Sequence, residues 1–183
     1  MCGITGFIDF KKTLACKEQT ILSMMDSIKH RGPDSQGHWI SGSDNLALGH
    51  LRLSIIDTSH AGHQPMHSKT DRFVVSYNGE IYNFLDIKHE LEQKGIIFNS
   101  NTDTEVLLLA IEEWGIDKSI EKFEGMFAFA IYDKKDKDLY LVRDRVGEKP
   151  LYYGYQNNIF FFSSELKAIN KLPNFKKIIS NKA

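Results

Sequence analysis

The sequence has few cysteines and no long run of one charge or of apolar residues. Its 183 residues include only Cys2 and Cys16, too few for a disulfide framework. Lysine and arginine number 23 against 24 aspartates and glutamates, giving a formal net charge of −1, and no basic block occurs. This balance disfavours nucleic acid or an anionic membrane as the main partner. No apolar run is long enough to span a membrane.

Targeting and cofactor motifs are also missing. The N-terminus has neither the basic segment nor the apolar core of a secretory signal, and with scarce cysteine this predicts a cytoplasmic location. No GxxxxGK(S/T) loop is present, so we expect no nucleotide and no cofactor in this chain. Three histidines, His60, His63 and His67, fall in a loop rather than on one helical face, which disfavours a metal site.

The pattern along the chain predicts an α+β fold in one domain, with antiparallel sheet packed against helices. Strands are expected at 2–10, 46–56 and 72–77, the last running into Asn78-Gly79, a strong turn pair. Helices are expected at 18–29, 84–95 and 103–114, the last opened by a capping box of Thr102 and Glu105. Short polar turns join four β-rich runs, which predicts a meander of hairpins over 126–133, 139–144, 149–155 and 158–165.

Cys2 directly follows the initiator methionine. If Met1 is removed, one residue carries both a thiol and a free α-amine. A thiol of pKa ~8.5 is mostly protonated at neutral pH, and an amine of pKa about 7.7–8.0 is a base of suitable strength. Nucleophiles activated by an N-terminal amine are an established arrangement. Cys2 is therefore a candidate nucleophile, unless its position is an accident of the start codon. Cys16 is expected to be a small, semi-buried residue rather than a second nucleophile.

A series of short motifs carries a family resemblance. In chain order they are MCGITGF, HRGPDSQG, GHLRLSIID, AGHQPM, YNGEIYN, TDTEV, GMFAFAIYD, RDRVGEKPLYY and SSELKAI. Together they resemble the glutaminase domain of glutamine-hydrolysing asparagine synthetases, a class II glutamine amidotransferase of the N-terminal-nucleophile hydrolase type. The resemblance implies a four-layer αββα sandwich, with two antiparallel sheets between helical layers. It also implies that residues 1–183 form a single glutaminase domain.

The resemblance implies roles for the catalytic residues. Cys2 would attack the side-chain amide of L-glutamine and form a thioester, from which water releases glutamate. Asn78, through its side-chain amide, and Gly79, through its backbone N–H, would stabilise the oxyanion. The alternative for Asn78-Gly79 is a simple turn.

The substrate-binding residues follow in the same way. Arg52 matches the position that binds the α-carboxylate of glutamine, although an arginine on an apolar strand is more often a surface charge. Glu80 and Asp103 match the positions that bind the α-ammonium. Asp103 would also favour the dipole of the helix that it begins. Leu53 and Ile56 are expected to wall the pocket.

Several functional questions stay open at this stage. The resemblance implies a synthetase domain, in cis or in trans, that would use ATP and Mg for asparagine synthesis and is absent here. The segment RDRVGEKPLYY would border that domain or the ammonia exit. A related enzyme that amidates another acceptor, such as a sugar acid in surface-polysaccharide synthesis, is an alternative. A non-catalytic interaction domain is a second alternative, and a homodimer is left open.

Overall fold

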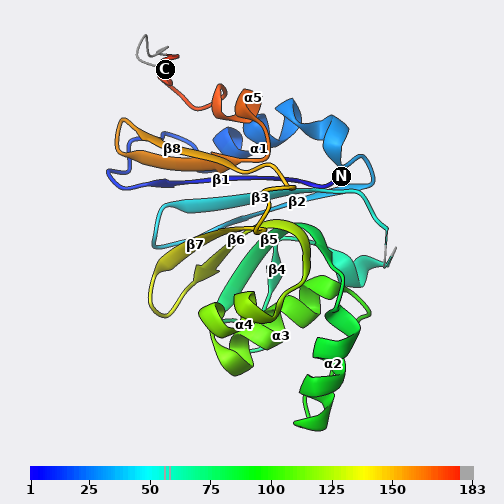
Figure 1. Ribbon diagram of the computed structural model, residues 1–183. Helices are drawn as coiled ribbons and strands as arrows, with labels where there is room; N and C mark the ends of the chain where they lie inside the picture. The colour runs from blue at the N-terminus through cyan, green and yellow to red at the C-terminus, as the bar shows by residue number, and fades with distance from the viewer. Residues whose placement is uncertain (56, 58, 178–183) are drawn as a thin grey trace.

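The computed structural model describes residues 1–55, 57 and 59–177. Two antiparallel sheets lie face to face with helices on their outer sides (Figure 1). The first sheet has the order β2-β3-β1-β9-β8, from β1 (Gly3–Asp9), β2 (Ser35–Ile40), β3 (Leu46–Arg52), β8 (Tyr152–Gln156) and β9 (Ile159–Ser163). The second has the order β4-β5-β6-β7, from β4 (Met66–His67), β5 (Phe73–Ile81), β6 (Gly125–Asp133) and β7 (Asp138–Arg143).

Helices cover the outer face of each sheet. The first sheet packs under α1 (Lys17–Ser27) and α5 (Leu166–Ile169), and the second packs against α3 (Asp103–Trp114), with α2 (Phe84–Gln93) and α4 (Ile116–Lys122) beside it. Side chains alternate between the two faces of a strand. In β1, Ile4 therefore packs between the sheets, whereas Phe7 packs under α1. The predicted αββα sandwich is confirmed.

The predicted single meander is wrong. The β6–β7 and β8–β9 hairpins both form, but they belong to different sheets. The chain crosses between the sheets after Asp144, whose carboxylate accepts main-chain hydrogen bonds from Phe127, Glu148 and Lys149 at 3.2, 2.8 and 2.9 Å. This buried carboxylate fixes a turn that the local strand pattern does not reveal.

The predicted turn at Asn78-Gly79 is also wrong, because β5 continues through both residues to Ile81. Asn78 pairs with Ala128 and Gly79 with Phe127 of β6. A Cβ atom on Gly79 would lie 2.4 Å from the carbonyl oxygen of Met126. Glycine is thus required here by close approach of two strands rather than by a turn.

The helix over 103–114 is confirmed, and its cap is partly as predicted. Thr102 Oγ1 accepts a hydrogen bond from the Glu105 N–H at 3.1 Å. The Glu105 carboxylate accepts from the N–H groups of Asn99 and Ser100, not from that of Thr102. Strand β2 and helix α4 were not predicted. Within the described residues, no helix has the length and apolar character needed to cross a membrane.

Candidate active site

A cavity of about 160 Å³ lies beside the N-terminus, where the ends of several elements meet. Cys2 precedes β1, Arg52 ends β3, and Asp103 begins α3. The cavity brings together all the predicted site residues that the structure describes, which are Cys2, Arg52, Leu53, Asn78, Gly79, Glu80 and Asp103. The other predicted residue, Ile56, lies outside the described residues.

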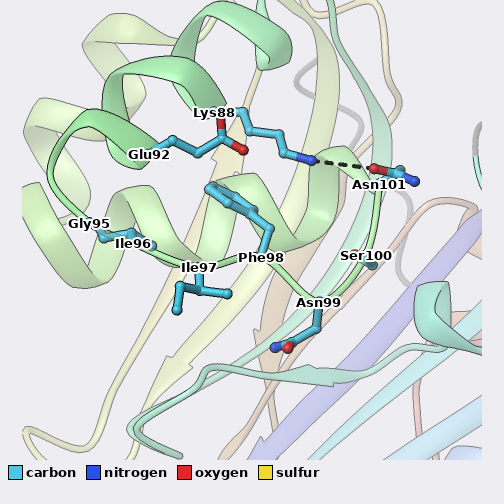
Figure 2. A pocket seen from close by; sticks show the side chains of 9 residues that line it. All are labelled: Lys88, Glu92, Gly95, Ile96, Ile97, Phe98, Asn99, Ser100 and Asn101. Atoms are coloured by element: carbon cyan, nitrogen blue, oxygen red, sulfur yellow. Dashed lines mark hydrogen bonds between the residues drawn. The ribbon is translucent and has the colours of Figure 1, made fainter.

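A larger open groove, of about 530 Å³, lies between α2 and the segment 95–101 (Figure 2). It is bordered by Lys88, whose Nζ donates to Asn101 Oδ1 at 3.3 Å, and by the exposed Ile97. The residues that line this groove include no predicted site residue and no cysteine. We therefore take the smaller cavity as the candidate active site, because it contains the candidate nucleophile Cys2, whereas the larger groove contains no cysteine.

The Cys2 thiol is half-buried and held by the backbone of Leu53. Sγ accepts from the Leu53 N–H at 3.4 Å and lies 3.6 Å from the Leu53 carbonyl oxygen. Burial raises the pKa of the Cys2 thiol, although the Leu53 contact, the N-terminal charge and Arg52 act in the opposite direction. A thiol in this state is a weak nucleophile until a base removes its proton.

Asn78 presents a buried donor to the site. Its side chain is 2% exposed, and its Nδ2 has no acceptor among the residues that the structure describes. Leaving a buried donor without an acceptor is costly, so such groups are rare in folded proteins. A donor kept in this state beside a candidate nucleophile suits an acceptor that arrives with the substrate or forms during the reaction.

Arg52 organises the loop that follows β3. Its Nη1 donates to the carbonyl of Ser59 at 2.7 Å, and its Nη2 donates to the carbonyl of Asp57. A Cβ atom on Gly62 would lie 2.1 Å from Nη2, so this glycine leaves room for the guanidinium. The guanidinium group of arginine has five N–H donors, and these two hydrogen bonds use two of them. Arg52 therefore shapes the cavity wall as well as lining it.

Asp103 joins the start of α3 to β5. Its Oδ2 accepts from the Tyr77 hydroxyl at 2.6 Å and from the Ile81 N–H at 3.1 Å. Burial raises the pKa of Asp103, and these two hydrogen bonds offset the effect only in part. Glu80 of β5 is half-buried and lines the same cavity, so the cavity has a second carboxylate.

Sequence reasoning missed residues that support the site. Gln64 Oε1 accepts from the Tyr77 N–H at 2.7 Å, and Gln64 Nε2 donates to Thr104 Oγ1 at 3.3 Å. Arg31 Nε donates to the Cys2 carbonyl at 2.9 Å, and its Nη1 donates to Glu165 at 3.1 Å. All four side chains belong to motifs that carry the family resemblance, and this membership is the signal that the sequence offers. The individual contacts follow only from the fold.

The prediction for Cys16 is wrong. Cys16 is exposed rather than semi-buried, and its Sγ caps α1 by accepting from the Gln19 N–H at 3.4 Å. Over the described ranges, no group of three or more histidine, cysteine, aspartate or glutamate residues could hold a metal ion.

Comparison with known proteins identifies the family. Residues 1–183 match the family described as a glutamine amidotransferase domain. This chain belongs to that family. Among its relatives, glutamine-hydrolyzing asparagine synthetase 3 of Bacillus subtilis (strain 168) is 43% identical over 178 residues, which cover 96% of this chain and 28% of the relative. Asparagine synthetase B of Escherichia coli (strain K12) is 39% identical over 171 residues, which cover 92% of this chain and 30% of the relative.

The chain thus spans less than a third of the length of these two relatives. Among solved structures, glutamine phosphoribosylpyrophosphate amidotransferase from B. subtilis, in complex with ADP and GMP, matches with a TM-score of 0.78. It is 23% identical, and the match covers 92% of this chain and 43% of that one. This likeness supports the αββα sandwich. The family model and the sequence relatives confirm the family predicted from the motifs.

Proposed function

We propose that this chain hydrolyses the side-chain amide of L-glutamine to glutamate and ammonia through a thioester on Cys2. The observation that carries this proposal is the buried Asn78 amide, which has no acceptor among the described residues and lines the cavity of Cys2. It supplies the kind of donor that a tetrahedral oxyanion requires, and the donor is itself buried.

The reaction proceeds in two halves. With Met1 removed, the α-amine of Cys2 takes the thiol proton, and Sγ attacks the amide carbon of glutamine. The negative charge that develops on the amide oxygen accepts hydrogen bonds from Asn78 Nδ2 and the Gly79 N–H. The C–N bond then breaks, and the proton on the amine passes to the leaving ammonia. Water attacks the resulting γ-glutamyl thioester, and glutamate and the thiol are released.

The opposite end of glutamine carries two charges that the cavity walls complement. The Arg52 fork binds the α-carboxylate, and Glu80 and Asp103 bind the α-ammonium. Leu53 contributes wall and backbone contacts beside the reacting thiol. The predicted contribution of Ile56 to the same wall remains a prediction.

The ammonia serves ATP-dependent asparagine synthesis by a synthetase domain, joined in cis or acting in trans. This assignment follows from the names of the relatives, in which the match to this chain covers only a minor part. ATP and Mg would bind in that domain, and residues 1–183 would work without a cofactor in the cytoplasm. The identity of the acceptor would then depend on residues outside the glutaminase domain.

The decisive assay is glutamate release from glutamine by the purified chain after removal of Met1, confirmed by intact mass spectrometry. A Cys2→Ala variant with the same processed terminus should release none. With aspartate and ATP added, the chain alone should form no asparagine. If the processed wild type neither turns over glutamine nor is labelled by a thiol-directed glutamine analogue, the chain is instead a non-catalytic binding domain.

A further inference from the structure

Lys149 places a buried cation at the candidate active site. The residue is 6% exposed and lines the same cavity as Cys2 and Asn78. Its Nζ donates to the sulfur of Met1 at 3.7 Å. Within the described part of the chain, no carboxylate forms an ion pair with it. Burial of an ammonium group beside a thioether is unfavourable, because the thioether does not compensate for the lost hydration. The position of Lys149 is therefore not explained by a gain in folding stability.

The backbone of Lys149 is fixed on both of its polar atoms. Its N–H donates to Asp144 Oδ2 at 2.9 Å, and its carbonyl accepts from Arg143 Nε at 2.7 Å. The same Asp144 oxygen accepts from the Phe127 N–H at 3.2 Å, and Phe127 pairs with Gly79. The backbone of Lys149 is therefore connected through Asp144 to β6, the strand that pairs with the proposed oxyanion donors. These contacts fix the turn from which the Lys149 side chain extends.

Removal of Met1 changes the surroundings of this cation. The thioether that contacts Nζ leaves, and a new α-amine appears on Cys2 in the same cavity. The other charged or titratable groups that line the cavity are Cys2, Arg52, Asp57, Tyr77, Glu80 and Asp103. Arg52 is held by the carbonyls of Asp57 and Ser59, on the loop that follows β3. Arg31 also faces Cys2, since its Nε donates to the Cys2 carbonyl at 2.9 Å, but it is paired with Glu165 at 3.1 Å. Among the described cations that line the cavity, Lys149 is the one that contacts Met1.

We propose that Lys149 is a positioning residue whose ammonium lowers the proton affinity of the amine–thiol pair of processed Cys2. A nearby positive charge disfavours a protonated amine and favours a thiolate. The amine is then unprotonated at neutral pH and ready to take the thiol proton. This inference rests on the proposed function, because it concerns the base of that reaction.

The test measures Cys2 reactivity without requiring turnover. All proteins carry Cys16→Ser, so that Cys2 is the single thiol, and serine keeps the cap of α1. Iodoacetamide alkylation of processed protein is followed by mass spectrometry between pH 5 and 10. In Lys149→Met the pH midpoint should rise by about 1 unit, as expected for loss of one positive charge from the same cavity, and the rate at pH 7 should fall about tenfold. Lys149→Arg and the exposed control Lys69→Met should follow the wild type.

A second readout separates this role from others. The acidic limb of kcat/KM for glutamine should move upward in Lys149→Met by the same amount. A pH profile of Lys149→Met that overlays the wild-type profile would overturn the proposal. A raised KM with an unmoved acidic limb would also overturn it, and would assign Lys149 to substrate binding. If Lys149→Met does not fold, Lys149→Gln replaces it. If the wild type alkylates normally but does not hydrolyse glutamine, the proposed function fails while the alkylation midpoints still decide the role of Lys149.

Discussion

The guanidinium of Arg31 donates a hydrogen bond from Nε to the main-chain carbonyl of Cys2, with 2.9 Å between the two atoms. Arg31 also donates from Nη1 to Glu165 at 3.1 Å. This chain of contacts joins the loop after α1 and the start of α5 to the residue that carries the candidate nucleophile. The N-terminal residue of a chain frays unless it is tied down, and Arg31 provides that restraint.

Loss of Glu165 should weaken the restraint in a pH-dependent way. Burial alone would raise the pKa of Glu165, but hydrogen bonds from Lys167, Arg31 and His30 lower it from 4.5 to about 2. The ionised carboxylate therefore stabilises the fold above pH ~4.5, and this stabilisation is lost as the pH falls toward 2. In urea unfolding, Glu165→Gln should be about 1–3 kcal/mol less stable than the wild type at pH 7 and should converge with it near pH 2. The exposed control Glu124→Gln should match the wild type at both values.

Asn78→Ala should reduce kcat about 10²–10³-fold with a smaller change in KM, because the lost donor acts mainly in the transition state. Stability should change little, since the removed Nδ2 has no acceptor among the described residues. Asn83, in the same motif, is a matched control because its side chain bonds the backbones of Lys122 and Glu124. Asn83→Ala should lower the melting temperature more than it lowers kcat. An Asn78→Ala variant that changes KM alone would contradict the oxyanion assignment.

Asp103→Asn should separate binding from stability. Burial raises the pKa of Asp103, so its ionisation at neutral pH opposes folding. The amide variant can still accept from Tyr77 and Ile81 but carries no charge. We expect its melting temperature at pH 7 to equal or exceed that of the wild type, while KM for glutamine rises because the α-ammonium loses a carboxylate. A variant with unchanged KM would remove Asp103 from the substrate site.

The sequence predicted most of the elements and seven of the residues that line the candidate site. Hydrophobic periodicity located helix 103–114 correctly, because its apolar run is long and capped by Thr102. The motifs identified the family and so placed distant residues in one cavity. The turn predicted at Asn78-Gly79 failed because pairing with β6 overrides the local preference of that pair. The contact between Arg31 and Glu165 joins residues 134 positions apart, and no local pattern encodes such a pair.

His50 should make the protein acid-sensitive. It lies between the sheets, 1% exposed, with Nε2 donating to the Tyr77 carbonyl at 2.9 Å. Burial lowers the pKa of His50 from 6.5 to about 3. The unfolded chain takes up a proton below pH ~6.5 while the folded chain does not, so stability falls between pH ~6.5 and 3. Melting curves over this range should show a weaker pH dependence in His50→Gln than in the wild type, whereas the exposed control His89→Gln should keep the wild-type slope.

Removal of Met1 should switch the enzyme on. While Met1 is attached, the nitrogen of Cys2 is part of a planar amide and cannot accept the thiol proton. Met1 also lines the cavity, and its sulfur contacts Lys149. Burial raises the pKa of the Cys2 thiol, so without the amine the thiolate is scarce at neutral pH. The Met1-bearing chain should therefore be inactive and the processed chain active.

Intact mass spectrometry can separate the two forms, and both can be treated with a thiol-directed glutamine analogue at pH 7. Labelling and glutamate release should follow the processed fraction of each preparation. Adding methionine aminopeptidase to the Met1-bearing form should restore both, which controls for misfolding. Equal labelling and equal turnover by the two forms would exclude the α-amine as the base. Another group that lines the cavity would then have to accept the thiol proton.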